Sequence, residues 1–254
     1  MGFANYRERY TFGCFSIGDI DFPRLLFGTS PFFGAGQFGD RSMRYYHNFY
    51  LNPQNITWLY RQAISRGLNA IHVPSDPTIV EAIVEATDAA GVRSFVLATV
   101  EAHNLDQELG LCRTIGADSI ITHGSFTDSS PESLREVLNR IKMQFRGITT
   151  GIATHTPGLV LPKVLELKEV EIILAPINLT GDFMEPSVES TLEAIAESRR
   201  RGKKVIAMKS LAAGSLTPDE AFKYVADKVD GVAVGITSPK ELDEVLAAAS
   251  KYFR

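Results

Sequence analysis

The feature that most constrains this sequence is an alternation of short apolar runs with longer helical stretches, repeated eight times after residue 23. The runs are nearly continuously apolar, as expected for parallel strands that helices cover. Right-handed βα units repeated in this way close most naturally into a barrel. We therefore predict an α/β fold of the (β/α)8 TIM-barrel class. Its strands are expected at residues 24–29, 68–72, 94–100, 118–123, 151–155, 170–178, 204–209 and 231–236.

Start and stop signals support the helices between these runs. Serine or threonine precedes proline at Pro131, Pro218 and Pro239, which places a capping residue directly before a proline in the first turn. Gly91 and Gly116 follow two of the helical stretches, where a helix commonly ends. A doubly wound open sheet is the alternative fold, but its usual glycine-rich first βα turn is missing.

Two segments add to the repeating pattern. Residues 10–24 alternate apolar and polar side chains around Gly18-Asp19, which predicts a β-hairpin that could close one end of the barrel. Residues 30–52 are rich in glycine and aromatic residues and predict a long loop after the first strand, with the role of a lid. We see no linker, so we expect residues 1–254 to form one domain.

Composition excludes several classes of function. A formal net charge of −4 disfavours nucleic-acid binding, which needs a concentrated positive surface. No apolar stretch approaches the roughly 20 residues that span a bilayer, so no membrane association is expected. The two cysteines, Cys14 and Cys112, fit neither a disulfide framework nor a CxxC metal motif. These observations favour a cytoplasmic location.

Four of the five histidines lie where an apolar run ends, at His72, His103, His123 and His155. Catalysis on this fold occurs at the face formed by the carboxyl ends of the strands, so these rings are expected to converge there. Imidazoles held in this way are good ligands for a divalent metal such as Zn, Mn or Fe, with Glu101 or Asp76 available to complete the set. A single histidine at a strand end is more often structural, but the repetition favours a metal site.

Other strand-end residues are candidates for direct roles in chemistry. Lys209 could form a Schiff base or bind an anionic group, because a buried amine can have a depressed pKa. Asn178 ends the sixth run and could orient a substrate, although an ordinary connection is the simpler interpretation. We therefore take His123, Lys209, Glu101 and Asn178 as candidate catalytic residues.

Two segments near the C-terminus resemble aldo/keto reductases. The stretches KKVIAMKSLAAGSLTP (residues 203–218) and GVAVGITSPKELDE (residues 231–244) are similar to the seventh and eighth strands of that family, and residues 26–29 also fit it. The resemblance implies a (β/α)8 barrel and, as in typical members, NADP bound without a Rossmann domain. The matched segments would place the cofactor phosphates near Ser210, Gly214, Ser215, Thr237, Ser238 and Lys240.

The resemblance fails at the residues that carry the family's chemistry. Typical members use aspartate, tyrosine, lysine and histidine, with tyrosine as the proton donor. Matched by strand, His72 stands at the aspartate position, residues 73–77 contain no tyrosine, and Val100 stands at the lysine position. Only the histidine is kept, as His123. Standard carbonyl reduction would therefore lack its general acid.

Three hypotheses follow. The leading one is a metal-dependent hydrolase or lyase on an aldo/keto-reductase-like barrel, acting on an anionic or carbonyl-containing small molecule. The second is an NADP-dependent oxidoreductase with an atypical proton donor. The third is a non-catalytic ligand-binding barrel. The exposed aromatics expected in residues 30–52 also leave a homo-oligomer open.

Overall fold

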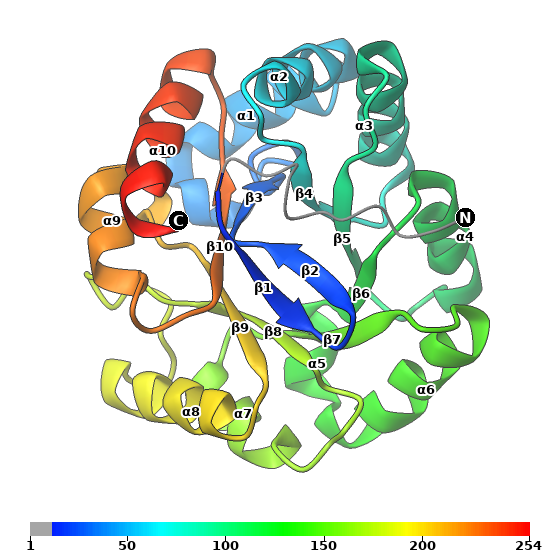
Figure 1. Cartoon of the computed structure of the whole chain (residues 1–254), viewed down its shortest axis with the longest axis vertical. Helices are drawn as coiled ribbons and strands as arrows, with labels where there is room; N and C mark the ends of the chain where they lie inside the picture. The colour runs from blue at the N-terminus through cyan, green and yellow to red at the C-terminus, as the bar shows by residue number, and fades with distance from the viewer. Residues whose placement is uncertain (1–11) are drawn as a thin grey trace.

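The chain is built around a closed barrel of parallel strands. The computed structural model describes residues 12–254, and within them eight parallel strands pair side by side in a ring. The last of these strands along the chain, β10, closes the ring by pairing with both β3 and β9. The ring order is β10 (Gly231–Gly235), β3 (Leu25–Gly28), β4 (Ala70–Pro74), β5 (Phe95–Val100), β6 (Ser119–Thr122), β7 (Thr149–Ala153), β8 (Ile172–Pro176) and β9 (Lys204–Met208). Figure 1 looks along the barrel, with the helices arranged around it. The predicted fold class is confirmed.

Helices follow the strands and cover the outside of the barrel (Figure 1). Their starts match the sequence signals: Ser238 accepts a hydrogen bond from the backbone of Glu241, and Thr217 forms a reciprocal capping box with Glu220. None of the helices in residues 12–254 is both long and apolar enough to cross a bilayer. The helices are η2 (Gly36–Arg41), α1 (Ser42–Phe49), α2 (Pro53–Ser65), α3 (Pro77–Ala90), α4 (Leu105–Ile115), α5 (Gly124–Ser129), η3 (Pro131–Ser133), α6 (Leu134–Gln144), α7 (Pro157–Val164), α8 (Val188–Arg200), η4 (Ala212–Gly214), α9 (Pro218–Val225) and α10 (Pro239–Tyr252).

The predicted hairpin closes the amino-terminal end of the barrel. Strands β1 (Cys14–Ile17) and β2 (Ile20–Pro23) pair antiparallel, and Figure 1 shows them across the barrel opening. Phe22 packs edge-on against Phe95, the first residue of β5, at 4.8 Å between ring centroids. The predicted range began at Tyr10, and residues 10 and 11 lie outside the described part of the chain.

Side chains that point into the barrel form two layers. An apolar layer near the hairpin includes Leu97, Ile121 and Leu174 and fills the interior. Because strand side chains alternate with period two, the next inward positions on β5 and just beyond β6 and β7 are Thr99, His123 and His155. The polar layer thus lies on the carboxyl side of the apolar one, where this fold carries its sites.

Residues 30–52 contain more structure than the predicted loop. They form η2 and α1, and Phe32, Tyr45 and Phe49 are almost fully buried. Phe32 packs on Phe49 at 4.9 Å between ring centroids. The aromatics that suggested an exposed lid instead anchor a folded helical segment against the barrel.

Candidate functional site

A cavity of about 1030 Å³ opens at the carboxyl end of the barrel. Its floor is formed by inward side chains of the strands, including His72, Thr99, His123 and His155. One wall is formed by the segment of η2 and α1, and the cavity extends along the loops that follow β9 and β10. Deep, mixed polar and apolar cavities at this end of a barrel are the usual place for ligands.

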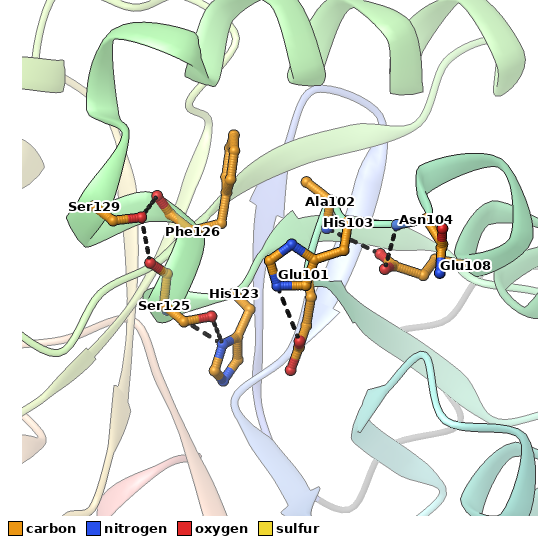
Figure 2. Close-up of polar contacts among 9 residues, drawn as sticks. All are labelled: Glu101, Ala102, His103, Asn104, Glu108, His123, Ser125, Phe126 and Ser129. Carbon is orange, nitrogen blue, oxygen red and sulfur yellow. Dashed lines mark hydrogen bonds and ion pairs between the residues drawn. The ribbon is translucent and has the colours of Figure 1, made fainter.

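His123 presents a hydrogen-bond donor to the cavity. Its Nδ1 caps α5 by accepting from the backbone N–H of Ser125 at 3.2 Å, and it lies 2.7 Å from the Ser125 hydroxyl (Figure 2). An Nδ1 that accepts from an N–H carries no proton, so the hydrogen-bond network assigns the neutral ring's proton to Nε2. Burial lowers the pKa of His123, against the opposing influence of Glu101 and Asp128.

Lys209 and His155 form a contiguous pair beside His123. The Nζ of Lys209 lies 3.3 Å from Nδ1 of His155, and the rings of His155 and His123 lie edge to face with centroids 5.6 Å apart. Burial, together with the Lys209 and His123 charges, lowers the pKa of His155 to about 4. Because neutral His155 is favoured, its Nδ1 can accept a hydrogen bond from the Lys209 ammonium.

Asp128 fixes the backbone that carries His155. Its carboxylate accepts from the Thr154 hydroxyl at 2.5 Å and from the His155 backbone N–H at 2.9 Å. Gly124 gives the imidazole room, since a Cβ there would lie 2.7 Å from Cδ2 of His155. The ring is therefore held from two sides.

Lys209 occupies a constrained backbone position at the end of β9. Its φ of +56° lies in the left-handed region, which is unfavourable for a residue with a side chain. Its ammonium also lies over the ring of Phe183, 4.5 Å from the centroid. Burial lowers the pKa of Lys209, and the Asp128 carboxylate opposes that shift. The amine is thus a stronger acid than a lysine in water.

His72 lies on the opposite side of the floor. Its Nε2 is 2.7 Å from the hydroxyl of Thr99, the inward neighbour on β5. Burial and, to a smaller extent, the charge of His123 lower the pKa of His72 to about 4. The ring is therefore neutral at pH 7 and already hydrogen-bonded to the barrel wall.

These contacts do not support the predicted metal site. Among residues 12–254, no group of three or more histidine, cysteine, aspartate or glutamate side chains is arranged to hold a metal ion. The contact with Ser125 leaves the proton of the neutral His123 ring on Nε2, and the Lys209 cation adjoins His155. His103 is largely exposed, and its Nε2 lies 3.7 Å from a carboxylate oxygen of Glu101 (Figure 2). The expected ligand set His72, His103, His123 and His155 is therefore not brought together.

Two of the candidate catalytic residues, Glu101 and Asn178, differ in whether they line the cavity. Glu101 lines the cavity near His123. Asn178 is fully buried and is absent from the cavity wall: its amide donates to the backbone of Asp182 and, at 3.4 Å, to the carbonyl oxygen of Lys209, while its oxygen accepts from Thr180. It holds the loop after β8 against Lys209.

The segments expected to bind a cofactor lie along the cavity. Ser210, Gly214, Ser215 and Thr237 line it, whereas Ser238 caps α10 and Lys240 extends outward with its side chain 87% exposed. The hydroxyl of Ser210 is buried and has no partner in the described structure. An orphaned buried hydroxyl in a cavity wall is a place for a ligand's hydrogen bond. The residues after β9 thus fit a polar, extended cofactor.

Arg41 joins the two walls of the cavity. Its guanidinium donates to the backbone carbonyl of Ala213 and lies 3.2 Å from the position a Cβ would take at Gly214. This contact fastens the η2 segment to the loop after β9. Neither Arg41 nor Asp128, Ser125 and Thr99 was expected from the sequence, because each acts through a partner on another element.

The fold is that of the aldo-keto reductases. No protein-family model matches the chain, and no curated protein matches it in sequence. Among solved structures, a protein of Pseudomonas aeruginosa provisionally described as an aldo-keto reductase is similar at a TM-score of 0.67, with 17% identity over 94% of both chains. A glycerol dehydrogenase from Gluconobacter oxydans gives 0.66, with 13% identity over 93% of this chain and 89% of that one. The holo form of an aldo-keto reductase from Bacillus halodurans gives 0.62, with 13% identity over 94% and 90%.

Proposed function

We propose that this protein is an oxidoreductase that uses a nicotinamide nucleotide, NADP in the expectation drawn from the resemblance, to interconvert a small carbonyl compound and its alcohol. The observation that carries the proposal is the contiguous group of Lys209, His155 and His123 at a cavity that continues past the unpartnered hydroxyl of Ser210. The fold shared with aldo-keto reductases agrees with it as an analogy. The metal-dependent hydrolase or lyase hypothesis has no ligand set to support it.

Each residue of the group has a distinct role in this proposal. His123 donates from Nε2 to the carbonyl oxygen of the substrate, which polarises the carbonyl. Lys209 is the atypical proton donor: its Nζ supplies a proton to the same oxygen as negative charge develops there. A partly buried ammonium with a lowered pKa suits this role better than an exposed lysine.

His155 and Asp128 position the proton donor. The Nδ1 of His155 accepts from the Lys209 ammonium and fixes its direction, and Asp128 holds the His155 backbone. The cofactor, when bound, supplies the hydride that adds to the carbonyl carbon. Ser210, Gly214, Ser215 and Thr237 are the residues that would hold it.

The test is turnover of a panel of small aldehydes, ketones and 2-oxo acids by the full chain. The oxidation of NADH or NADPH measures the rate. Lys209→Met should lower kcat by about 100-fold or more, the usual contribution of general acid catalysis, with cofactor affinity changed little. Lys203→Met is the matched control, because Lys203 is also shielded from solvent and has a lowered pKa, but it is absent from the cavity wall and donates to the backbone carbonyls of Leu167 and Val170.

Two outcomes would contradict the proposal. If neither cofactor binds at millimolar concentration, the nicotinamide-dependent function is wrong. If a cofactor binds and carbonyls are turned over equally by wild type and Lys209→Met, Lys209 is not the donor. Binding without turnover of any carbonyl would favour the non-catalytic ligand-binding barrel.

A further inference from the structure

Resting on the proposed function but departing from the NADP that the resemblance implies, we infer that Glu241 and Glu244 select a nicotinamide cofactor without a 2′-phosphate, so that NADH binds in preference to NADPH. The reacting groups, Lys209 and His123, lie at the barrel mouth. The start of α10, including both glutamates, lines the same cavity. A dinucleotide with its nicotinamide at Lys209 and its adenosine half at the start of α10 would have its ribose beside both glutamates.

Glu241 occupies the hydrogen-bond donors of Thr237, which lies just before α10. The amino end of a helix attracts anions through its free backbone N–H groups and its dipole. At α10 the Glu241 carboxylate already accepts from the Thr237 backbone N–H at 2.7 Å and from the Thr237 hydroxyl at 2.8 and 2.9 Å. At this segment, where the resemblance would place a phosphate of the cofactor, a carboxylate of the chain itself thus already accepts the hydrogen bonds.

Lys240, the lysine next to Glu241 in the sequence, does not offset the negative charge of the two glutamates in the cavity. Lys240 is absent from the cavity wall, points outward and lies 3.9 Å from Glu244. Within the described residues, the cations that line the cavity are Arg41 and Lys209. Arg41 lies at Ala213 and Gly214, a position suited to the pyrophosphate that both cofactors share. No described cation lines the α10 end.

Ser210 gives an independent indication that this cavity holds a polar ligand. Its side chain is 1% exposed, its hydroxyl has no partner in the described structure, and it lines the same cavity as the glutamates. The acidic pair is therefore part of a cavity that has an unmet hydrogen bond, rather than a group of surface charges.

The chemistry of the two cofactors differs at one place. NADP carries a phosphate of nearly two negative charges where NAD carries a ribose hydroxyl. A carboxylate repels the phosphate, whereas its free lone pairs accept a hydrogen bond from the hydroxyl. Like charges brought together in a binding site cost several kcal/mol, so the discrimination is expected to be at least about tenfold in Kd.

Isothermal titration calorimetry of the full chain with NADH and NADPH tests this inference without relying on turnover. We expect the Kd for NADH to be at least about tenfold lower than the Kd for NADPH. The ratio of the NADPH Kd to the NADH Kd should fall at high salt, where charge repulsion is screened. Glu241→Gln and Glu244→Gln should each reduce the ratio severalfold, and Glu241→Lys should reduce it further or reverse it. Glutamine at 241 retains an oxygen that can accept the Thr237 N–H.

Asp243→Asn is the matched control. Asp243 lies on the same helix and carries the same charge, but it pairs with Arg66 at 2.8 Å and is absent from the cavity wall. Its removal should leave the NADH to NADPH ratio unchanged, and an equal effect at Asp243 would overturn the assignment to the glutamates. If Glu241→Gln unfolds the protein, Glu244→Gln carries the test alone.

The remaining outcomes separate this inference from the proposed function. NADPH binding as tightly as NADH, or more tightly, would overturn the inference and leave the oxidoreductase proposal intact. Failure of both cofactors to bind would overturn the proposed function itself. Competition by 5′-AMP and by 2′,5′-ADP gives a second measure, in which 5′-AMP should be the stronger competitor.

Discussion

The Nζ of Lys209 lies 3.3 Å from Nδ1 of His155, two side chains that come from the ends of different strands. Burial and the adjacent Lys209 charge lower the pKa of His155 to about 4, and Lys209 is held in a left-handed backbone conformation. The pair accounts for two features of the site. The cation beside the imidazole opposes a metal, and the imidazole aims the cation at the substrate's place in the proposed reaction.

Gly124→Ala should disturb this pair directly. The new Cβ would lie 2.7 Å from Cδ2 and 2.9 Å from Nε2 of His155, so the ring must move away from its present place. We expect a loss of about 1–3 kcal/mol in the free energy of unfolding and a lower kcat in the proposed reaction. Denaturant unfolding and kinetics measure the two effects.

Gly110→Ala is the control for that substitution. Gly110 lies within α4, and a Cβ there would meet nothing within 4 Å. Alanine in an open helical position is expected to raise stability by up to about 1 kcal/mol. Equal effects at Gly110 and Gly124 would show that contact with His155 is not the cause.

Asp128→Asn should weaken the support of His155. An amide in place of the carboxylate leaves either the Thr154 hydroxyl or the His155 N–H without a good acceptor, at a cost of about 1–3 kcal/mol. The Asp128 charge also raises the pKa of Lys209, so its loss should lower that pKa further. The limb of the pH profile of kcat that depends on Lys209 should move to lower pH. An unchanged limb would argue against the proton-donor role.

Much of the fold could be predicted from the sequence. The apolar runs and the proline, serine and glycine signals between them depend on local structure, and they gave the barrel and the hairpin. Residues 30–52 were harder, because α1 is stabilised by contacts such as Phe32 with Phe49 and Phe38 with Tyr45, which the sequence pattern does not reveal. The predicted loop is for this reason a folded segment.

The sequence could predict which strand-end residues line the site, but not the contacts that those residues make. Period-two alternation places His72 and His123 at the barrel mouth, and the structure finds both on the cavity wall. Which nitrogen of each ring faces the cavity depends on Ser125 and Thr99, and no sequence pattern states those contacts. The predicted metal site failed at this step. Asp128 was missed because it lies on α5, a helix of six residues that was not expected.

Acidification should destabilise the protein between pH 6.5 and about 4. His72 and His155 have folded-state pKa values lowered to about 4 from 6.5, so in this window the unfolded chain binds more protons than the folded one. Stability therefore falls as the pH falls through the window and is fully present above it. Each 1 kcal/mol lost should lower Tm by about 2–4 °C for a chain of this size.

Thermal unfolding across that pH range measures the effect. His72→Gln and His155→Gln should each have a shallower dependence of Tm on pH, because one titrating group is removed. His47→Gln on α1 serves as a comparison outside the cavity. A Tm of the wild type that stays constant from pH 6.5 to 4 would contradict the lowered pKa values of these two rings.

Arg41→Gln should weaken the binding of both nicotinamide cofactors by a common factor. Arg41 fastens η2 to the loop after β9 through the carbonyl of Ala213, and it lines the cavity. Losing one charge-assisted contact should raise both Kd values by about tenfold, since such hydrogen bonds contribute about 1.5–3 kcal/mol. Arg44→Gln, a neighbour on α1 that is absent from the cavity wall, is the control.

Because both cofactors share the pyrophosphate, the ratio of the Kd for NADPH to the Kd for NADH should keep its wild-type value in Arg41→Gln. A change in that ratio would instead place Arg41 at the 2′ position and contradict the division of roles between Arg41 and Glu241.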